Sequence, residues 1–236
     1  MRQIKQPVEI DAIKKAIEIT NHGLERAKEY IHEGVNGFQL KAEMDYEFTK
    51  LGATHGFSPI ITTGPNTCLH HLQVNKRILK SGEPILFDIG AEHEYYTADV
   101  SRTYFFPQPT KRQKAVYDAV YRVQKVAENL VKPGVLWKGY ALKVEELMGE
   151  ELARLGLIAD NNRKEIRKYF SHGIGHSLGL DAHDPCDYTG AFEENMIITI
   201  EPGIYIPEEG FGVRIEDDYL VDKSGVSNLS AHISYS

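Results

Sequence analysis

Ile85-Leu86-Phe87-Asp88-Ile89-Gly90 and, after a short acidic segment, Asp99-Val100-Ser101-Arg102-Thr103 are the stretch on which the fold of this 236-residue chain depends. A carboxylate between apolar strand residues is costly to bury unless a cation compensates its charge. The separation of 99 − 88 = 11 residues suits adjacent antiparallel strands joined by a turn at Glu92-His93-Glu94, which would let Asp88 and Asp99 face each other. A lone aspartate at a strand end is also common as a turn cap or as an ion-pair partner, here of Arg102. The pair therefore needs support from elsewhere in the chain.

That support lies in the second half of the sequence. Three histidines occur within twelve residues, in His172-Gly173-Ile174-Gly175-His176 and at His183. Glycines between them allow ligands to approach the backbone closely. Packed or surface histidines are the alternative interpretation of this run.

Two further acids end or interrupt apolar strands, Glu201 after Ile198-Thr199-Ile200 and Glu216 after Val213-Arg214-Ile215. Each could be an ordinary strand terminus or a paired core charge. Together with Asp88 and Asp99 they make four carboxylates beside one or more imidazoles, a set without thiolates. Such a set suits hard or borderline divalent cations, with Mn²⁺ preferred, and four acids can supply the bridges that two ions need.

The rest of the chain alternates helical and strand patterns in two similar halves. Helices are expected at about 8–32, 38–51, 111–131 and 140–155, and strands at 59–63, 84–91 and 95–106. Gly34-Val35 before the second helix matches Gly134-Val135 before the fourth, 134 − 34 = 100 residues later. We therefore expect an internal duplication, with two α+β lobes around a cleft.

Composition narrows the class of protein. The chain is 42% apolar and 26% charged, with no apolar run long enough for a membrane span and no signal peptide, so a cytoplasmic protein is expected. A formal charge of −7 disfavours nucleic acid as a partner. Cys68 and Cys186 are too few for a disulfide framework and are expected to be reduced.

Taken together, these motifs resemble the metallopeptidases with the pita-bread fold, which include methionine aminopeptidase, prolidase and aminopeptidase P. The resemblance covers nearly the whole chain. Within this family the sequence is most similar to aminopeptidase P, through the stretches 178–183, 201–205 and 212–216. It implies an α+β pita-bread fold in which two pseudo-twofold-related lobes line a central metal cleft with antiparallel sheets and carry helices outside. It also implies hydrolysis of the N-terminal residue from peptides with proline in second position.

The resemblance further implies which residues hold two divalent ions, most simply Mn²⁺, with Co²⁺, Fe²⁺ and Zn²⁺ as alternatives. The implied ligands are Asp88, Asp99, His176, Glu201 and Glu216. Asp99 and Glu216 would bridge the ions, and a water between them would be the nucleophile. Glu201 would also carry the proton to the leaving nitrogen.

The same resemblance assigns helpers around the ligands. His70, rather than His71, would be the upstream catalytic histidine, and His183 would donate to the substrate carbonyl or its oxyanion. His172, Arg214 and Tyr205 would bind substrate or balance charge.

The expected organisation is a linker-like segment at 1–7 followed by the catalytic domain at 8–236, with lobes at about 8–109 and 110–236. Aminopeptidase P and prolidase usually carry a further N-terminal domain, which is not seen before residue 8. A peptide is the expected partner, and a homodimer is left open.

Three alternatives stay open at this point. Prolidase activity on Xaa-Pro dipeptides is the first, ahead of methionine aminopeptidase activity. A catalytically weak or silent pita-bread module that binds peptides or proteins is the second. A metal-free hydrolase resembling creatinase is the third, although the full ligand set argues against it.

Overall fold

Apolar residues at helical spacing form two long helices in each half of the chain. A computed structural model describes residues 2–70 and 72–235. The helices are α1 (Pro7–Glu29), α2 (Gly37–Lys50), α3 (Lys111–Leu130), α4 (Trp137–Arg154) and the short α5 (Arg163–Tyr169). Asn36 and Thr110 cap α2 and α3, since each side chain accepts a hydrogen bond from a backbone N–H of the first turn.

Within residues 2–70 and 72–235, the strands form four small antiparallel sheets between these helices. The first half contains β1 (Thr54–His55), β2 (Ile60–Thr63), the 3₁₀ turn η1 (Gly64–Cys68), β3 (Glu83–Ile89), β4 (Ala91–His93), β5 (Tyr96–Thr97) and β6 (Val100–Phe106). The second half contains β7 (Ile197–Ile200), β8 (Gly203–Ile206), β9 (Phe211–Arg214), β10 (Asp217–Val221) and β11 (Val226–Asn228). Their orders are β1-β4-β5, β2-β3-β6, β11-β10-β7 and β8-β9.

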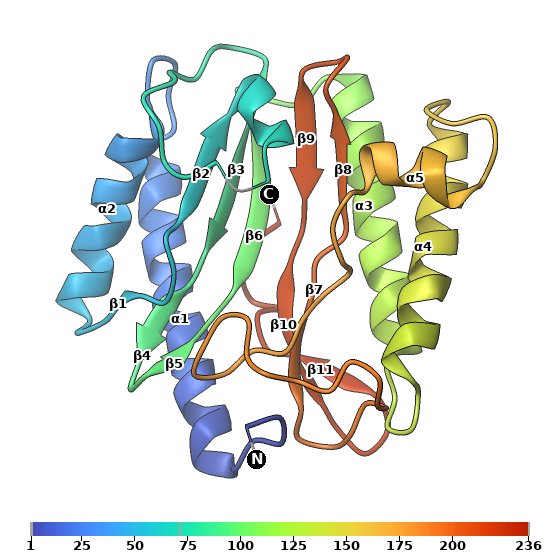
Figure 1. Cartoon of the computed structure of the whole chain (residues 1–236). Coiled ribbons are helices and arrows are strands. Elements are labelled where there is room, and N and C mark those ends of the chain that lie inside the picture. The colour runs from blue at the N-terminus through green and yellow to red at the C-terminus, as the bar shows by residue number, and fades with distance from the viewer. Residues whose placement is uncertain (1, 71, 236) are drawn as a thin grey trace.

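The two halves meet where β6 lies beside the β9–β10 junction, with helices on the outer side of each half (Figure 1). Ser101 of β6 and Glu216 exchange backbone hydrogen bonds of 3.3 and 3.1 Å. The Thr103 hydroxyl also donates to the Arg214 carbonyl at 3.0 Å. The strands therefore face inward and the helices outward, which confirms the α+β pita-bread architecture.

The duplication expected from the glycines is visible in the backbone. Gly34 and Gly134 have φ angles of 90° and 88°, a left-handed conformation that favours glycine. Each donates its N–H at 2.9 Å to a later strand-like segment, Gly34 to Leu79 and Gly134 to Phe192. The same turn thus introduces the second helix of each half.

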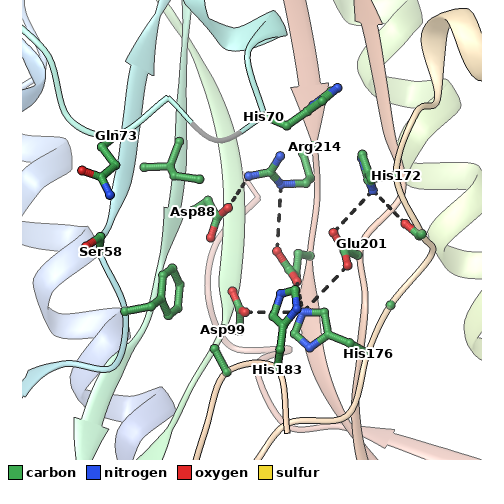
Figure 2. A pocket seen from close by; sticks show the side chains of 16 residues that line it. Ser58, His70, Gln73, Asp88, Asp99, His172, His176, His183, Glu201 and Arg214 are labelled. Atoms are coloured by element: carbon green, nitrogen blue, oxygen red, sulfur yellow. Dashed lines mark hydrogen bonds and ion pairs between the residues drawn. The ribbon is translucent and has the colours of Figure 1, made fainter. Parts of the chain in front are cut away.

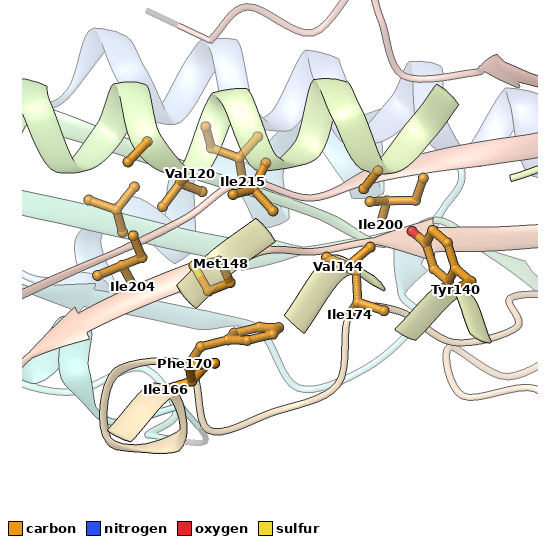
Figure 3. Close-up of a cluster of buried hydrophobic side chains, with 14 of the residues drawn as sticks. Val120, Tyr140, Val144, Met148, Ile166, Phe170, Ile174, Ile200, Ile204 and Ile215 are labelled. Atoms are coloured by element: carbon orange, nitrogen blue, oxygen red, sulfur yellow. The ribbon is translucent and has the colours of Figure 1, made fainter. Parts of the chain in front are cut away.

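Each half has its own apolar core. In the second, Val120 of α3 and Val144 and Met148 of α4 are fully buried against the inner strands, represented by Ile200 and Ile204 (Figure 3). Burial of this kind contributes about 25 cal/mol per Å² of apolar surface and fixes the strands that carry the polar cleft.

The β4–β5 turn differs from expectation. β4 extends through His93, and the turn is made by Glu94 and Tyr95 with φ angles of 50° and 72°. It lies later than the expected Glu92-His93-Glu94, because β4 pairs with both β1 and β5 and so continues past Glu92.

The segment before α1 packs on the second half. Ile4 forms a bridge with Met196, and the Lys5 N–H donates to the Asn195 carbonyl at 2.8 Å. The Lys5 side chain is buried. Over the described ranges 2–70 and 72–235, none of the helices combines the length and apolar character that crossing a membrane requires.

Candidate metal centre

A cavity of about 550 Å³ lies between the inner strands of the two halves. Its polar walls come from Asp88 of β3 and Asp99 just before β6 on one side. The 172–176 segment, Glu201 just after β7 and Arg214 of β9 form the other side (Figure 2). The lining includes nine sequence-predicted residues, His70, Asp88, Asp99, His172, His176, His183, Glu201, Arg214 and Glu216.

Asp88 and Asp99 are brought together by an unusually close strand pair. Asp88 lies opposite Ser101 in the β3–β6 register, so Asp99 just precedes β6. A Cβ atom on Gly90 would lie 1.7 Å from the Ala98 carbonyl oxygen, so only glycine fits between the two aspartates. The Asp99 N–H donates to the buried Asp218 carboxylate at 3.1 Å, which fixes the backbone there.

His176 and Glu201 come from neighbouring extended segments. The Thr199 N–H donates to the His176 carbonyl, and the Glu201 N–H donates to the Ile174 carbonyl, both at 2.8 Å. Gly175 sits so close to β7 that a Cβ would lie 2.0 Å from the Thr199 oxygen. The glycine-rich run therefore allows the histidine segment to lie against β7.

Glu216 completes the cluster from the junction of the halves. The Ser101 hydroxyl donates to its Oε2 at 2.7 Å. Asp99, His176 and Glu216 are all buried, and one ligand atom of each lies within 4.8 Å of the others. Both halves thus contribute to one cluster of possible metal ligands.

The orientation of His176 fits a cation. Its Nδ1 lies 3.2 Å from the Ser177 carbonyl, which requires the N–H on that nitrogen. The lone pair of Nε2 then points among carboxylates, 3.6 Å from Asp99 and 3.8 Å from both Glu201 and Glu216. Acceptors facing acceptors repel one another unless a cation or a shared proton lies between them.

Two further observations support the same fit. The buried Asp99 Oδ1 has no hydrogen-bond partner among the described residues. An unpaired buried polar atom in a native protein needs an explanation, such as a bound ion. Burial, together with neighbouring carboxylates, raises the pKa of Asp99 and of Glu216 well above the ordinary range. Burial also raises the pKa of Glu201 to about 8 and lowers that of His176 to about 4.

Asp88 lies beside this cluster and is ion-paired with Arg214. Arg214 Nη1 donates to the Tyr205 hydroxyl at 3.0 Å. His172 Nδ1 lies 2.7 Å from the Gly173 carbonyl and carries the proton, so its Nε2 accepts from the Tyr205 hydroxyl at 2.8 Å. Burial lowers the pKa of His172 to about 3, so the ring is neutral. Tyr205 thus links the arginine to the histidine.

The remaining two histidines lie at opposite ends of the cluster. His70 contacts the Tyr205 ring edge-on at 4.0 Å between centroids, and its Nε2 lies 2.6 Å from the Ser171 hydroxyl. His183 stacks on His176 at 4.0 Å. His71, the alternative to His70, lies outside the described residues.

Sequence patterns missed part of the wall. Phe57, Ser58, Ile60 and Gln73 also line the cavity, and Figure 2 places Ser58 and Gln73 across from His172 and Glu201. They carry no motif of their own, since their role depends on the opposite half. Asp218, a fully buried acid two residues after Glu216, is also absent from the predicted site.

Comparison with known proteins identifies a family and relatives that this chain resembles. Residues 11–223 match the pattern of metallopeptidase family M24. The chain is 33% identical over 254 residues to a Xaa-Pro aminopeptidase of Escherichia coli, covering 99% of this chain and 57% of that protein. It is 36% identical over 236 residues to a Xaa-Pro dipeptidase of Pyrococcus horikoshii, covering 98% and 63%.

Solved structures agree. Proline aminopeptidase P II from Yersinia pestis superposes with a TM-score of 0.94 at 33% identity, covering 100% of this chain and 59% of that one. A zinc-substituted aminopeptidase P of E. coli in complex with product gives 0.93 at 31% identity, covering 100% and 58%. The chain thus spans less than two thirds of the length of these relatives.

Proposed function

The chain belongs to metallopeptidase family M24, and on that basis we propose that it removes the N-terminal residue from peptides with proline in second position. The observation that carries the proposal is the cluster of Asp99, His176 and Glu216 inside the cavity, which both halves build. Both relatives are named for substrates in which proline follows the residue that is removed. The names differ in whether the substrate is a dipeptide or a longer peptide.

The five residues that would hold two divalent cations are Asp88, Asp99, His176, Glu201 and Glu216. All five line one cavity and offer one imidazole and four carboxylates, a donor set that suits Mn²⁺. When bound, the cations would supply Lewis acidity, polarising the substrate carbonyl and making water a stronger acid. Asp88 would then exchange part of its contact with Arg214 for a cation.

Glu201 is placed to move a proton. Its carboxylate lies 3.5 Å from His172 Nδ1 and 3.8 Å from His176 Nε2, at the open side of the cluster. A carboxylate there can take a proton from water and deliver it to the leaving nitrogen. This nitrogen belongs to proline in the proposed substrate and must become an amine before it departs.

His183 and His172 would position the substrate. His183 lines the cavity beside His176 and can donate to the carbonyl of the residue before proline. A proline amide has no N–H, so the pocket must hold its substrate by shape and by contacts to oxygen. Neutral His172, fixed by Tyr205, faces the cavity with Phe57 and Ile60 as apolar surface.

A peptide panel tests the proposal directly. Rates would be measured at equal enzyme with added Mn²⁺ on Ala-Pro-Ala, Ala-Pro and Met-Ala-Ser, and we expect that order of decreasing rate. Preference for Ala-Pro would instead support a dipeptidase, and preference for Met-Ala-Ser would contradict the proline assignment.

The metal requirement has its own controls. Chelation should abolish turnover, and Mn²⁺ or Co²⁺ should restore it. Asp99→Ala and Glu216→Ala should lose both ions and nearly all activity, because each removes a buried carboxylate from the proposed ligand cluster. Protein that stays fully active after dialysis against a chelator would refute the two-metal proposal. Protein purified without chelator that contains no metal would favour a silent binding module.

A further inference from the structure

The segment 2–5 reaches the catalytic side of the molecule through a buried carboxylate. Asp184 directly follows His183 in sequence and is 2% exposed. Lys5 Nζ donates to its Oδ2 at 3.1 Å, and Arg2 pairs with its Oδ1. The side chains of Lys5 and Asp184 are each 1% exposed, although 179 residues separate them. We call Arg2, Lys5 and Asp184 the N-terminal clamp.

The clamp is built into the loop that carries His183. The Asp184 N–H donates to the Ser177 carbonyl at 2.9 Å. Gly179 packs so closely on the carboxylate that a Cβ would lie 2.7 Å from Asp184 Oδ2. The Thr97 N–H, from the first half, donates to the Gly179 carbonyl at 2.9 Å. The loop is therefore held from both halves of the chain.

His183 itself depends on this backbone. Its side chain is exposed and stacks on His176 at 4.0 Å, so close packing does not enclose it. The position of an exposed ring follows the backbone that carries it, and a buried ion pair that loses one partner disturbs its surroundings strongly. A displacement of about 1 Å can cost about 10²-fold in rate when a group must meet a substrate atom.

We propose that Arg2 and Lys5 act through Asp184 as positioning residues for His183. The N-terminal segment thereby determines the position of the imidazole that contacts the substrate. Only the expected loss of kcat rests on the proposed function. The position of the ring can be measured without any substrate.

Asp184→Asn is the test variant, and Glu151→Gln is its matched control. Glu151 of α4 is a buried carboxylate that also pairs with two cations, Arg122 and Arg154, both at 2.7 Å, but it lies outside the cavity. With Mn²⁺ and Ala-Pro-Ala, Asp184→Asn should lower kcat by about 10-fold to 10²-fold with KM changed by less than about threefold and metal content kept. Glu151→Gln should keep the parent's kcat.

A second variant separates positioning from loss of stability. Lys5→Met/Asp184→Asn removes both buried charges, so it should fold more stably than Asp184→Asn and still turn over slowly. Return of the parent's kcat in this double variant would overturn the proposal, as would an equal loss of kcat in Glu151→Gln.

Nuclear magnetic resonance of the chelator-treated protein gives the readout that needs no activity. The Hε1 signal of His183, assigned by its loss in His183→Gln, should be displaced by the stacked His176 ring. Asp184→Asn and the double variant should move it toward the position of a free imidazole, and Glu151→Gln should not. An unmoved signal in both clamp variants would overturn the proposal. If the parent cleaves none of the three peptides, the proposed function fails, and this signal still decides whether the clamp positions His183.

Discussion

Replacing Asp99 by asparagine should make the metal-free protein more stable, although the variant loses a proposed metal ligand. Asp99 is buried, its Oδ1 has no partner among the described residues, and its nearest neighbours include Glu216 and the lone pair of His176. Asparagine has nearly the same shape, carries no charge, and offers an N–H₂ group that can donate to a carboxylate. The substitution therefore relieves repulsion without opening a cavity.

The size of the effect follows from the separation of the charges. Two unit charges within 4.8 Å repel by roughly 3 kcal/mol or more at an effective dielectric constant of about 20. Uptake of a proton limits the cost, because an Asp with an ordinary pKa of about 3.9 is neutralised at pH 7 for about 4 kcal/mol. Arg214, 4.0 Å from Glu216, offsets part of the repulsion. We expect a gain of about 2 kcal/mol, which corresponds to about 4 to 8 °C in Tm for a chain of this size.

Differential scanning calorimetry with chelator and with Mn²⁺ measures both parts of the prediction. At a hundredfold excess of Mn²⁺ over its Kd the parent should gain about 2.7 kcal/mol for each ion bound, and Asp99→Asn should gain far less. The order of stability would then reverse between the two conditions. Asp118→Asn, at a partly exposed aspartate paired with Lys114, is the control and should change stability by less than about 0.5 kcal/mol. A metal-free Asp99→Asn protein that melts at or below the parent would refute the reasoning.

Three further outcomes test other parts of the molecule. His183→Ala and His70→Ala should keep metal, measured by atomic absorption, and lower kcat by about 10²-fold to 10⁴-fold; metal loss in His183→Ala would mean that the ligand set is wrong. Gly175→Ala places a Cβ 2.0 Å from the Thr199 oxygen, so it should lower both Tm and Mn²⁺ affinity, and a variant with the parent's affinity would show that the segment can move away from β7. Met148→Ala, in the fully buried core of the second half, should cost about 2 to 5 kcal/mol in urea unfolding with Mn²⁺ affinity unchanged, and a smaller cost would mean that the core collapses around the gap.

Local patterns were sufficient for the four long helices and for nine of the residues that line the cavity. α3 begins at Lys111 and ends at Leu130, within one residue of the expected 111–131. Both signals that define it, the apolar period and the Thr110 cap, lie in the sequence of the helix itself and the residue before it. Asp88 and Asp99 are neighbours because an 11-residue separation fits a hairpin, and Gly90 confirms how close the strands come. The five proposed ligands line one cavity, while their assignment as ligands stays a prediction.

Features that depend on distant partners could not be predicted. The segment before α1 has no hydrophobic period and its sequence predicts a linker, yet Lys5 is buried because Asp184 lies against it. Ser58 and Gln73 have no local signal because the opposite half of the chain defines the wall to which they belong. Each of these depends on a contact that only the folded chain creates.

The backbone pairing between Ser101 and Glu216 also has a consequence for synthesis. A ribosome releases the chain from its N-terminus, so β6 emerges long before the strand junction that pairs with it. Until Glu216 has been made, the cluster of Asp99, His176 and Glu216 lacks one of its three members, and Ser101 of β6 lacks its partner at the junction of the halves. Under the proposed function, peptide hydrolysis therefore cannot begin on the growing polypeptide itself. The order of the sequence delays the activity until Glu216 has been made.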